Sequence, residues 1–315
     1  MVILPSVRQL CHLVALSDHT HFGRAATACH VTQSTLSASI KELEGLLEAP
    51  LVDRSKRSVV LTALGLETAE RARKIIAEME DLAAAARAAR EPLSGTIRMG
   101  AIPTVAPYLL PRVLPGLRRA YGQLKLYLVE DLTASLIDAL HQGKLDVVLL
   151  ALPCDCGAVE TSILFEDPFV VALPKGHALS NEAHITPQQL SCEELLLLKD
   201  GHCLREHALA ACNRAGRRHT EGFEATSLLT LVQMADNGLG TTLLPAVAVE
   251  AGLIRGTGLV TRPLVSADPS RHIGLVWRKG TGRRHEFLLL AQVFARRDTQ
   301  HAARQTGNRQ PDSSS

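Results

Sequence analysis

The chain has 315 residues, of which 46% are hydrophobic and only 3% are aromatic. This length predicts two or three domains with sizeable cores, and the composition is that of a globular protein, which excludes a disordered or fibrous chain. The formal net charge of +2 does not by itself indicate a nucleic-acid partner, and the lack of a long uncharged apolar run excludes a membrane-embedded protein.

The seven cysteines are an odd number, are scattered through the chain, and follow no secretory signal. This pattern favours a reducing cytoplasm over a disulfide scaffold, so we expect a cytoplasmic protein that makes no membrane contact. The histidines show no spacing typical of a metal site. We therefore expect neither a metal nor another cofactor.

Helical periodicity runs through the first fifty residues in three segments. The first segment ends near residue 18, a short helix is predicted at 22–29, and a third helix begins after Thr32. We expect this third helix to end at Pro50. Its apolar face is formed by Leu36, Ile40, Leu43 and Leu47. The spacing is typical of a helix–turn–helix whose second helix reads a DNA major groove.

The other face of this third helix carries short polar side chains that can reach base edges or phosphates. The candidates for DNA contact on this helix and at its start are Thr32, Gln33, Ser34, Thr35, Ser37, Ser39 and Lys41. A plain three-helix bundle with a polar face predicts the same periodicity. Periodicity alone therefore leaves both interpretations open.

Two short strands around a basic turn are predicted over residues 51–61. In the wing of a winged helix–turn–helix, Arg54, Lys56 and Arg57 would meet DNA phosphates and add salt-dependent affinity. An ordinary solvated hairpin is the alternative. The position of the hairpin directly after the reading helix favours the wing.

A long helix is predicted from Thr62, its N-cap, to about Arg90. Small and apolar residues recur along it at alternating three- and four-residue steps: Ala69, Ala72, Ile76, Met79, Ala83 and Ala86. Such a seam is typical of coiled coils and predicts a homodimer. Packing of the helix within its own domain is the alternative. Residues 92–95 then mark a domain boundary.

This part of the chain resembles the DNA-binding end of the LysR-type transcriptional regulators. The resemblance is carried by residues 25–26, 31–37, 51–54 and 61–65, with Ile40, Leu43 and Glu44. Two positions depart from the family pattern, because Ser34 stands where proline is usual and Glu48 where glycine is frequent. The resemblance implies a winged helix–turn–helix over 1–61, a dimerising linker helix over 62–91 and an effector domain over 92–300.

From residue 96 onward strands and helices alternate, which predicts a parallel sheet and an overall fold class of α plus α/β. Strands are predicted at 96–100, 124–129, 145–152, 169–173, 195–198, 240–245 and 273–277, and helices at 105–120, 134–141, 227–237 and 283–296. These elements resemble the two-lobed, periplasmic-binding-protein-like effector domain of the LysR family. The resemblance implies lobe I over about 95–166 and 270–300 and lobe II over about 167–269. Residues 301–315 are polar and are expected to be a disordered tail.

The residues from Gly201 to Cys212 carry the clearest chemical signal. A helix is predicted to begin at His202, so that Cys203 lies in its first turn, where unpaired backbone N–H groups and the helix dipole favour an anion. His202 and Arg205 add donors and positive charge nearby. We expect these features to lower the pKa of the Cys203 thiol and to raise its thiolate fraction.

Cys212 lies nine residues after Cys203, about 13 Å along a helix axis, whereas a disulfide requires Cα atoms within about 7 Å. If the segment is helical, a bond between these cysteines would require it to unwind, which is the geometry of a switch. The alternative is a helix with two unrelated buried cysteines, because free cysteine is among the most buried residue types.

The effector domain more specifically resembles the peroxide-sensing OxyR branch of the LysR family. The resemblance is carried by residues 102–111, by the Gly-His-Cys-Leu-Arg run at 201–205 with Cys212, and by 225–228. It implies that Cys203 is the peroxidatic thiol and that Cys212 resolves it as a disulfide. By the same resemblance, the residues that bind hydrogen peroxide are Thr104, His202, Arg205 and, on a weaker match, Thr133.

Each of these peroxide-binding roles has a structural alternative. His202 could serve only as a helix cap, Arg205 could pair with a carboxylate, and Thr104 could simply end a strand. Separately, Cys154 and Cys156 follow a predicted strand and could bind a metal with Cys192 or a histidine. Loop cysteines without a metal are the favoured interpretation of that pair.

We therefore expect a DNA-binding transcriptional regulator, not an enzyme, that senses hydrogen peroxide through a reversible Cys203–Cys212 disulfide and changes its binding to promoters of oxidative-stress genes. The expected partners are double-stranded promoter DNA, hydrogen peroxide, a cellular thiol reductant, RNA polymerase, and further copies of the chain in a homodimer or homotetramer. One rival is a LysR-type regulator of a small organic ligand whose cysteines merely pack. A thiol peroxidase is a second rival, against which the helix–turn–helix argues.

Overall fold

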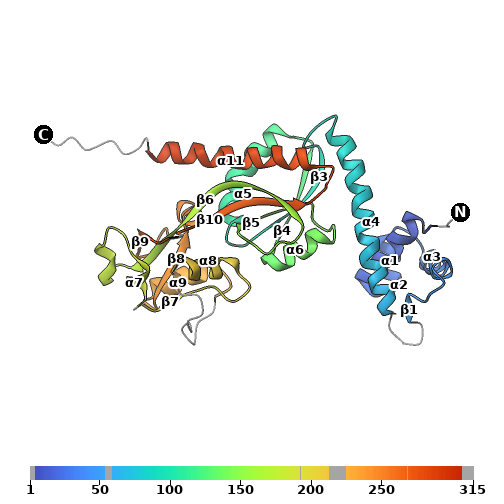
Figure 1. Ribbon diagram of the computed structural model, residues 1–315, viewed down its shortest axis with the longest axis horizontal. Coiled ribbons are helices and arrows are strands. Elements are labelled where there is room, and N and C mark those ends of the chain that lie inside the picture. Colours follow the sequence, from blue (N-terminus) through green and yellow to red (C-terminus); the bar gives the residue numbers. More distant parts are fainter. Residues whose placement is uncertain (1–3, 54–58, 192, 213–224, 268, 307–315) are drawn as a thin grey trace. The chain divides into compact units, whose positions relative to one another are not determined.

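The computed structural model describes residues 4–53, 59–191, 193–212, 225–267 and 269–306. The chain divides into two compact units, one formed by residues 1–87 with 141–144 and the other by residues 88–140 with 145–315 (Figure 1). Within the described residues, no helix is both long and apolar enough to span a bilayer.

Three helices form the core of the first unit: α1 (Val7–His19), α2 (Phe22–Ala28) and α3 (Gln33–Leu46). Ser6 caps α1 in a capping box with Gln9, and the side chain of Thr32 caps α3. The helices pack around a shared apolar cluster that includes Leu13, Leu16, Ala25, Ala26, Leu36, Ile40, Leu43 and Leu51. The three predicted helices are thus confirmed, and the spacing of their apolar residues is what closes this core.

Helix α3 differs from the sequence prediction at two places. Ser39, predicted to face DNA, is only 8% exposed, and its Oγ lies 2.8 Å from Nδ1 of the buried His12 on α1. The prediction for Ser39 is wrong because this serine completes a polar contact between two helices. The helix also ends at Leu46, before Pro50, and Glu48 has a φ of +52°. Glycine adopts this left-handed conformation without strain, which accounts for its frequency at this position of the family pattern.

A short hairpin follows α3, as predicted. Its strands β1 (Val52–Asp53) and β2 (Val60–Leu61) pair antiparallel. The turn between them, with Arg54, Lys56 and Arg57, lies outside the described residues.

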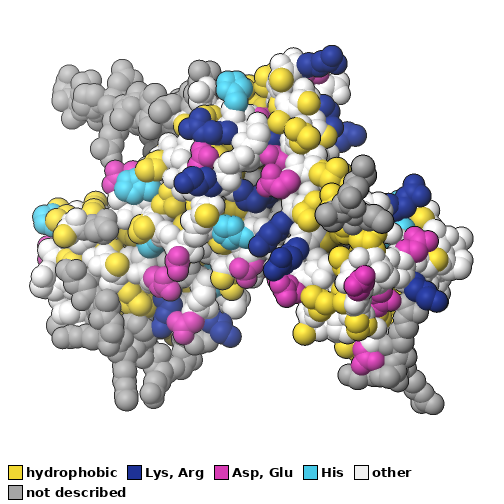
Figure 2. All heavy atoms as spheres, turned by 45° about the vertical axis from the view of Figure 1, so that its right-hand side comes forward, with side chains coloured by type: hydrophobic (Ala, Val, Ile, Leu, Met, Phe, Trp, Pro, Cys, Tyr) yellow, Lys and Arg dark blue, Asp and Glu magenta, His cyan; other side chains and the backbone are white. Residues whose placement is uncertain are grey.

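On the face drawn in Figure 2, Lys and Arg side chains are interspersed with Asp and Glu, in keeping with the formal net charge of +2.

Helix α4 (Ala63–Ala88) is preceded by Thr62, whose Oγ1 accepts a hydrogen bond of 2.9 Å from the backbone N–H of Gly65 and so caps the helix. The predicted seam along α4 is divided. Its first members, Ala69 and Ala72, are buried within the first unit. Of its later members, Ile76 is half-buried, and Met79, Ala83 and Ala86 are exposed. The large apolar side chains exposed on this part of the helix are Ile75, Met79 and Leu82, which keep the three- and four-residue spacing of a helix face but share only Met79 with the predicted seam.

Among its described residues, the second unit contains one mixed sheet with the strand order β4-β3-β5-β10-β6-β8-β7, and β9 pairs with β6. Its strands are β3 (Gly95–Ala101), β4 (Leu124–Glu130), β5 (Val147–Leu152), β6 (Val159–Pro174), β7 (Leu195–Leu196), β8 (Thr241–Pro245), β9 (Leu259–Pro263) and β10 (Ser270–Arg278). Its helices are α5 (Ala106–Ala120), α6 (Thr133–His141), the 3-10 helix η1 (Ala178–Asn181), α7 (Pro187–Leu190), α8 (Cys203–Ala211), α9 (Leu228–Asp236), α10 (Ala246–Glu250) and α11 (Arg284–Thr306). The predicted alternation of strands and helices is confirmed.

The sheet is mixed because one strand from late in the chain returns to its middle. Strands β3, β4 and β5 are parallel, as βαβ connections require, whereas β10 runs antiparallel to both β5 and β6. Strand β6 begins at Val159, earlier than the predicted strand at 169–173. Its first part pairs with β10 and its second part with β8 and β9. Strands β6 and β10 therefore join two lobes of the sheet.

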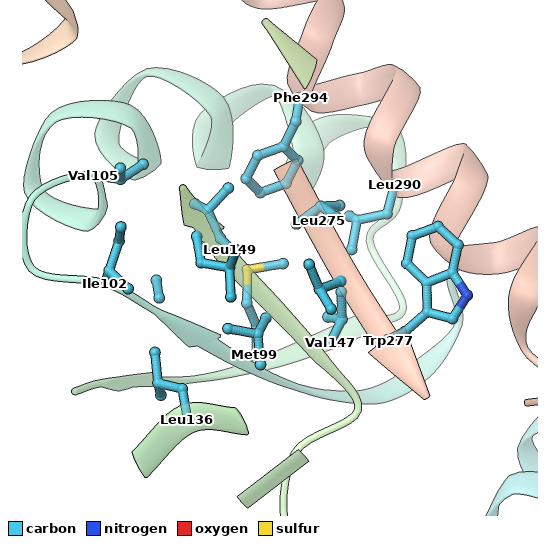
Figure 3. Close-up of a cluster of buried hydrophobic side chains, with 14 of the residues drawn as sticks. Met99, Ile102, Val105, Leu136, Val147, Leu149, Leu275, Trp277, Leu290 and Phe294 are labelled. Carbon is cyan, nitrogen blue, oxygen red and sulfur yellow. The ribbon is translucent and has the colours of Figure 1, made fainter. Parts of the chain in front are cut away.

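Each lobe has its own apolar cluster. The lobe I cluster lies between the β3, β5 and β10 strands and the helices that cover them, and Figure 3 shows Met99, Val147, Leu149, Leu275, Trp277, Leu290 and Phe294 within it. The lobe II cluster includes Phe169, Leu195, Leu198, Leu204, Leu231, Val232 and Leu244. Helix α11 continues to Thr306, so residues 301–306, predicted to belong to a disordered tail, have helical backbone.

Candidate functional site

Helix α8 begins at Cys203, one residue after the predicted start, and ends at Ala211. Gly201, with a φ of +93°, turns the chain into the helix, and His202 is the N-cap. Cys203 therefore occupies the first helical position. At this end the backbone N–H groups have no partner within the helix and the helix dipole is positive, so the site favours an anion.

A small pocket at the start of α8 brings together three segments that are far apart in the sequence. The pocket is lined by Ile102, Pro103, Thr104, Leu132, Thr133, Gly201, His202 and Cys203. The empty space within it is about 170 Å³ with the open mouth included, and none of this space is wide enough for a water molecule in this structure. Thr104, Thr133 and His202 thus line one pocket with Cys203, and these are three of the residues predicted to bind peroxide.

Thr104 is held by Arg271, a residue that the sequence analysis missed. Nη1 of Arg271 donates to Thr104 Oγ1 at 3.0 Å, and Nη2 donates to the Thr104 carbonyl oxygen at 3.2 Å. Nε and Nη2 also contact the Asp167 carboxylate, at 3.0 and 2.9 Å, and both side chains are almost completely buried. Because a guanidinium only donates, Thr104 Oγ1 is the acceptor here and its own proton remains available for another acceptor.

The position of Arg271 explains why it was missed. It stands near the start of β10, next to an apolar strand, and carries no local motif. The only sign of its role in the sequence was its charge beside a predicted apolar strand, because charged side chains are rarely buried without a partner. The alternative that Thr104 simply ends a strand is wrong, because β3 already ends at Ala101.

Thr133 begins helix α6 and supplies an unsatisfied group. Its Oγ1 is buried and makes no hydrogen bond with any of the described residues. A buried hydroxyl without a partner costs free energy, and most such groups in proteins find one. A small polar molecule in the pocket would supply the partner that Thr133 lacks.

The imidazole of His202 is buried, with the residue only 7% exposed, and it makes no capping hydrogen bond. His202 thus occupies the N-cap position, but its side chain does not cap the helix. Burial lowers the pKa of His202 below its ordinary value of 6.5. The ring is therefore neutral near pH 7, with one nitrogen that donates and one that accepts.

We expect protonation of His202 to destabilise the fold at low pH. An imidazole whose pKa is lowered by burial binds a proton less readily in the folded state than in the unfolded chain. Its contribution to the free energy of unfolding is therefore complete above pH 6.5 and is lost as the pH falls toward and through the lowered pKa. Chemical denaturation at about pH 7.5 and about pH 5 should show a larger loss for the wild type than for His202→Gln.

The exposed His184 provides a matched control for this comparison. His184→Gln should keep the pH dependence of the wild type, because an exposed imidazole is solvated in both states. If wild type and His202→Gln lost the same free energy of unfolding between the two pH values, His202 would not be buried in its neutral form.

Arg205 is placed outside the pocket lining. Its Nε lies 2.7 Å from a carboxylate oxygen of Asp200, and its Nη1 donates to the Leu198 carbonyl oxygen at 3.1 Å. These contacts correspond to the alternative that Arg205 pairs with a carboxylate. They also hold the turn that precedes α8 in place. Because Asp200 is 81% exposed, the pair itself stabilises the fold only slightly. The predicted contact of Arg205 with peroxide stays a prediction.

Cys203 and Cys212 lie at opposite ends of α8 and pack in different lobes. Cys203 is half-buried against the lobe I cluster, whereas Cys212 is the C-cap of the helix and is buried in the lobe II cluster. Both are present as thiols. The nine-residue helix keeps them about 13 Å apart along its axis, so they cannot bond while α8 is intact.

Cys154 and Cys156 are joined by a disulfide directly after β5. Both lie in the loop that follows the strand, as the favoured interpretation expects, and their bond to each other is an addition to it. The metal site is wrong for this pair, because bonded sulfurs are not thiolate ligands. Cys192, the third suggested ligand, lies outside the described residues. Within the described part of the chain, no cluster of three or more His, Cys, Asp or Glu side chains is arranged to hold a metal ion.

The candidate DNA contacts on α3 lie at its N-terminal end, except Lys41, which lies past the middle of the helix. Ser37 is half-buried. The others are exposed: Thr32, Gln33, Ser34, Thr35 and Lys41. Thr32 Oγ1 accepts from the backbone N–H of Thr35 and contacts the hydroxyls of Ser34 and Thr35. The start of α3 is thereby held in a fixed conformation with its polar side chains accessible.

Both units of the chain match known protein families. The model of the LysR substrate binding domain matches residues 90–298, and that of the bacterial regulatory helix-turn-helix protein of the lysR family matches residues 7–66. The chain is 40% identical over 296 residues to the DNA-binding transcriptional dual regulator OxyR of Escherichia coli K12, which covers 94% of this chain and 97% of that protein.

Two solved structures of OxyR are also similar over nearly the whole chain. Full-length OxyR of Pseudomonas aeruginosa, a cysteine-to-aspartate variant, superimposes with a TM-score of 0.77 at 34% identity and covers 93% of this chain and 98% of that one. A hydrogen-peroxide-bound cysteine-to-serine mutant of Corynebacterium glutamicum OxyR gives a TM-score of 0.66 at 30% identity, with 100% of both chains covered. The protein therefore belongs to the LysR family of helix–turn–helix regulators, in which it is similar to OxyR.

Proposed function

We propose that this protein is a transcriptional regulator that binds promoter DNA and senses hydrogen peroxide through a reversible Cys203–Cys212 disulfide. The observation that carries the proposal is the pocket at the start of α8, which Thr104, Thr133 and His202 line together with Cys203. Its similarity to OxyR proteins, one of them solved with hydrogen peroxide bound, supports the same assignment.

The chemistry begins at Cys203. Its thiolate attacks one oxygen of hydrogen peroxide, the O–O bond breaks, and Cys203 becomes a sulfenic acid. The departing oxygen gains negative charge and leaves as water after taking up a proton. The Thr104 and Thr133 hydroxyls and the neutral His202 ring are the donors that would stabilise this charge.

The second step joins the two ends of α8. The Cys212 thiol attacks the sulfenic sulfur, a second water leaves, and the Cys203–Cys212 disulfide forms. Because α8 holds these cysteines too far apart, the helix must unwind and Cys212 must leave the lobe II core. A cellular thiol reductant restores both thiols by disulfide exchange. The rearrangement of α8 is the event that we propose is transmitted to promoter binding.

A homodimer through α4 is part of this proposal. The exposed apolar stripe of Ile75, Met79 and Leu82 has the spacing of a coiled-coil face and would be buried by a second copy of the helix. Assembly of two such dimers, and contact with RNA polymerase, are expectations that rest on the family resemblance alone.

A regulator of a small organic ligand is the second candidate. In this structure the pocket at Cys203 leaves no room even for a molecule the size of water, which disfavours an organic ligand there. A larger pocket of about 500 Å³, open solvent included, lies between α5 and β4 and shares no residue with the first. An organic effector bound there would act from a place that neither cysteine lines.

Mass spectrometry of peroxide-treated protein separates the two candidates. After one equivalent of hydrogen peroxide and alkylation of the remaining thiols, we expect a linked peptide that joins Cys203 to Cys212. Reduction with dithiothreitol should return both peptides to the alkylated form. If every peroxide-treated sample contained only unlinked Cys203 and Cys212 peptides, the organic-ligand regulator would be the better assignment.

A further inference from the structure

A second pair of cysteines lies beside the helix that carries Cys203. Cys154 and Cys156 are bonded to each other, with their Cα atoms 5.4 Å apart, while Cys203 and Cys212 are thiols. Cys156 is buried in the lobe I cluster, and Cys154 is half-buried against it. The fold therefore accommodates one oxidised pair while the proposed sensing pair is reduced.

The loop that carries this disulfide is hydrogen-bonded to α8. Nε2 of His207 lies 3.1 Å from the carbonyl oxygen of Pro153, the residue that precedes Cys154. His207 is one helical turn after Cys203, and residues four apart share a face of a helix. Cys203 itself packs against the lobe I cluster, as do both cysteines of the pair. The face of α8 that turns toward lobe I is thus attached next to the disulfide.

We propose that Cys154 and Cys156 form a second redox-active pair, whose state controls how firmly α8 is held on lobe I through the contact between His207 and Pro153. The disulfide restricts the backbone of residues 154–156 and so keeps the Pro153 carbonyl in place for His207. Reduction restores conformational freedom to this loop and weakens the contact. Unwinding of α8 breaks the same hydrogen bond, so the reduced pair makes unwinding easier.

The chemistry of the pair requires a dithiol reductant and an oxidant of the kind already proposed. A dithiol such as dithiothreitol transfers two electrons and two protons, which gives thiols at Cys154 and Cys156 and a disulfide in the reductant. Hydrogen peroxide reverses the change: one thiol becomes a sulfenic acid with loss of water, and the other displaces a second water to restore the disulfide. The sensor would then respond to the reductant supply as well as to peroxide.

The coupling can be measured without the proposed sensing reaction. Full-length Cys203→Ser protein is prepared with the Cys154–Cys156 pair either oxidised or reduced by dithiothreitol, and alkylation with mass spectrometry verifies each state. Hydrogen–deuterium exchange of the α8 amides should be about three- to tenfold faster in the reduced form, the range expected for loss of one hydrogen bond. Amides of α5 should exchange equally in both states. Equal exchange of α8 in both states would overturn the proposal.

A variant of His207 tests the path of the coupling. In Cys203→Ser protein that also carries His207→Ala, the α8 amides should exchange rapidly whatever the state of the pair, because the attachment is already lost. A persistent difference between the two states would show that the pair does not act through His207, which contradicts the proposal as stated. Using the native pair with a reductant avoids replacing the buried Cys156, which risks a folding defect.

The consequence for sensing rests on the proposed function and is measured separately. In the wild type, peroxide should form the Cys203–Cys212 bond up to about tenfold faster when the Cys154–Cys156 pair is reduced. If that bond never forms in either state, the proposed function fails, while the exchange measurement still decides the coupling. If the bond forms at the same rate in both states, the coupling has no effect on sensing and this part of the proposal is wrong.

Discussion

Cys203→Ser protein is expected to bind promoter DNA as the wild type does but to lose every peroxide-dependent change in its footprint. A serine hydroxyl is a far weaker nucleophile than a thiolate and cannot form the sulfenic acid from which the disulfide arises. The side chain lies in the pocket of the second unit, whereas the candidate DNA contacts lie on α3 of the first. Nuclease footprinting with and without hydrogen peroxide measures the effect directly.

Two further variants make the result specific. Cys212→Ser should still react with peroxide at Cys203, because the pocket is intact, but should retain a sulfenic acid that a dimedone-type reagent traps. Cys11→Ser should respond as the wild type. Burial raises the pKa of the Cys11 and Cys29 thiols, so both are protonated at neutral pH and react slowly with peroxide. A full peroxide response in Cys203→Ser would refute the sensing role of this residue.

The sequence predicted the local elements of the switch because its signals were local. The Gly201 turn, the helix-favouring residues after it and the nine-residue interval between cysteines all act within one segment, and α8 forms as expected. The same holds for Thr32 and Thr62, whose side chains cap the helices that follow them. Where a short stretch decides the structure, periodicity and capping are sufficient.

Features that depend on packing between distant segments were not predictable in this way. Ser39 has the spacing of a DNA-facing residue, but its hydroxyl meets His12 from another helix. Arg271 has no local signal, yet it joins Thr104 to Asp167 across the sheet. The Cys154–Cys156 bond depends on the conformation of the loop, which residue spacing does not determine. In each case the partner is chosen by the tertiary fold.

Arg271 is expected to be the most sensitive charged residue of the second unit. Arg271→Met would leave the Asp167 carboxylate buried without its cation, and breaking a buried ion pair in this way typically costs about 3–5 kcal/mol of folding free energy. Chemical denaturation of the full-length protein measures this loss. Arg284, whose ion pair with Glu160 is 60% exposed on the arginine side, is the matched control. Arg284→Met should change the free energy of unfolding by less than about 1 kcal/mol.

Arg271→Lys separates the effect on chemistry from that on stability. Lysine keeps a cation near Asp167, but a single ammonium cannot reproduce the fork that also holds both oxygens of Thr104. We expect the reaction of Cys203 with peroxide, followed by stopped-flow mixing, to slow about tenfold because Thr104 is no longer fixed as a donor. Thr104→Val removes the donor itself and should slow the reaction about 100-fold.

The double variant tests whether these two residues act as a unit. If Arg271 acts on the chemistry through Thr104, adding Arg271→Lys to Thr104→Val should cause little further loss of rate, since the hydroxyl it positions is already absent. Independent effects would instead multiply to about 1,000-fold, the product of the two expected losses. That outcome would assign Arg271 a direct electrostatic influence on the pocket and would leave the orientation of Thr104 to other contacts.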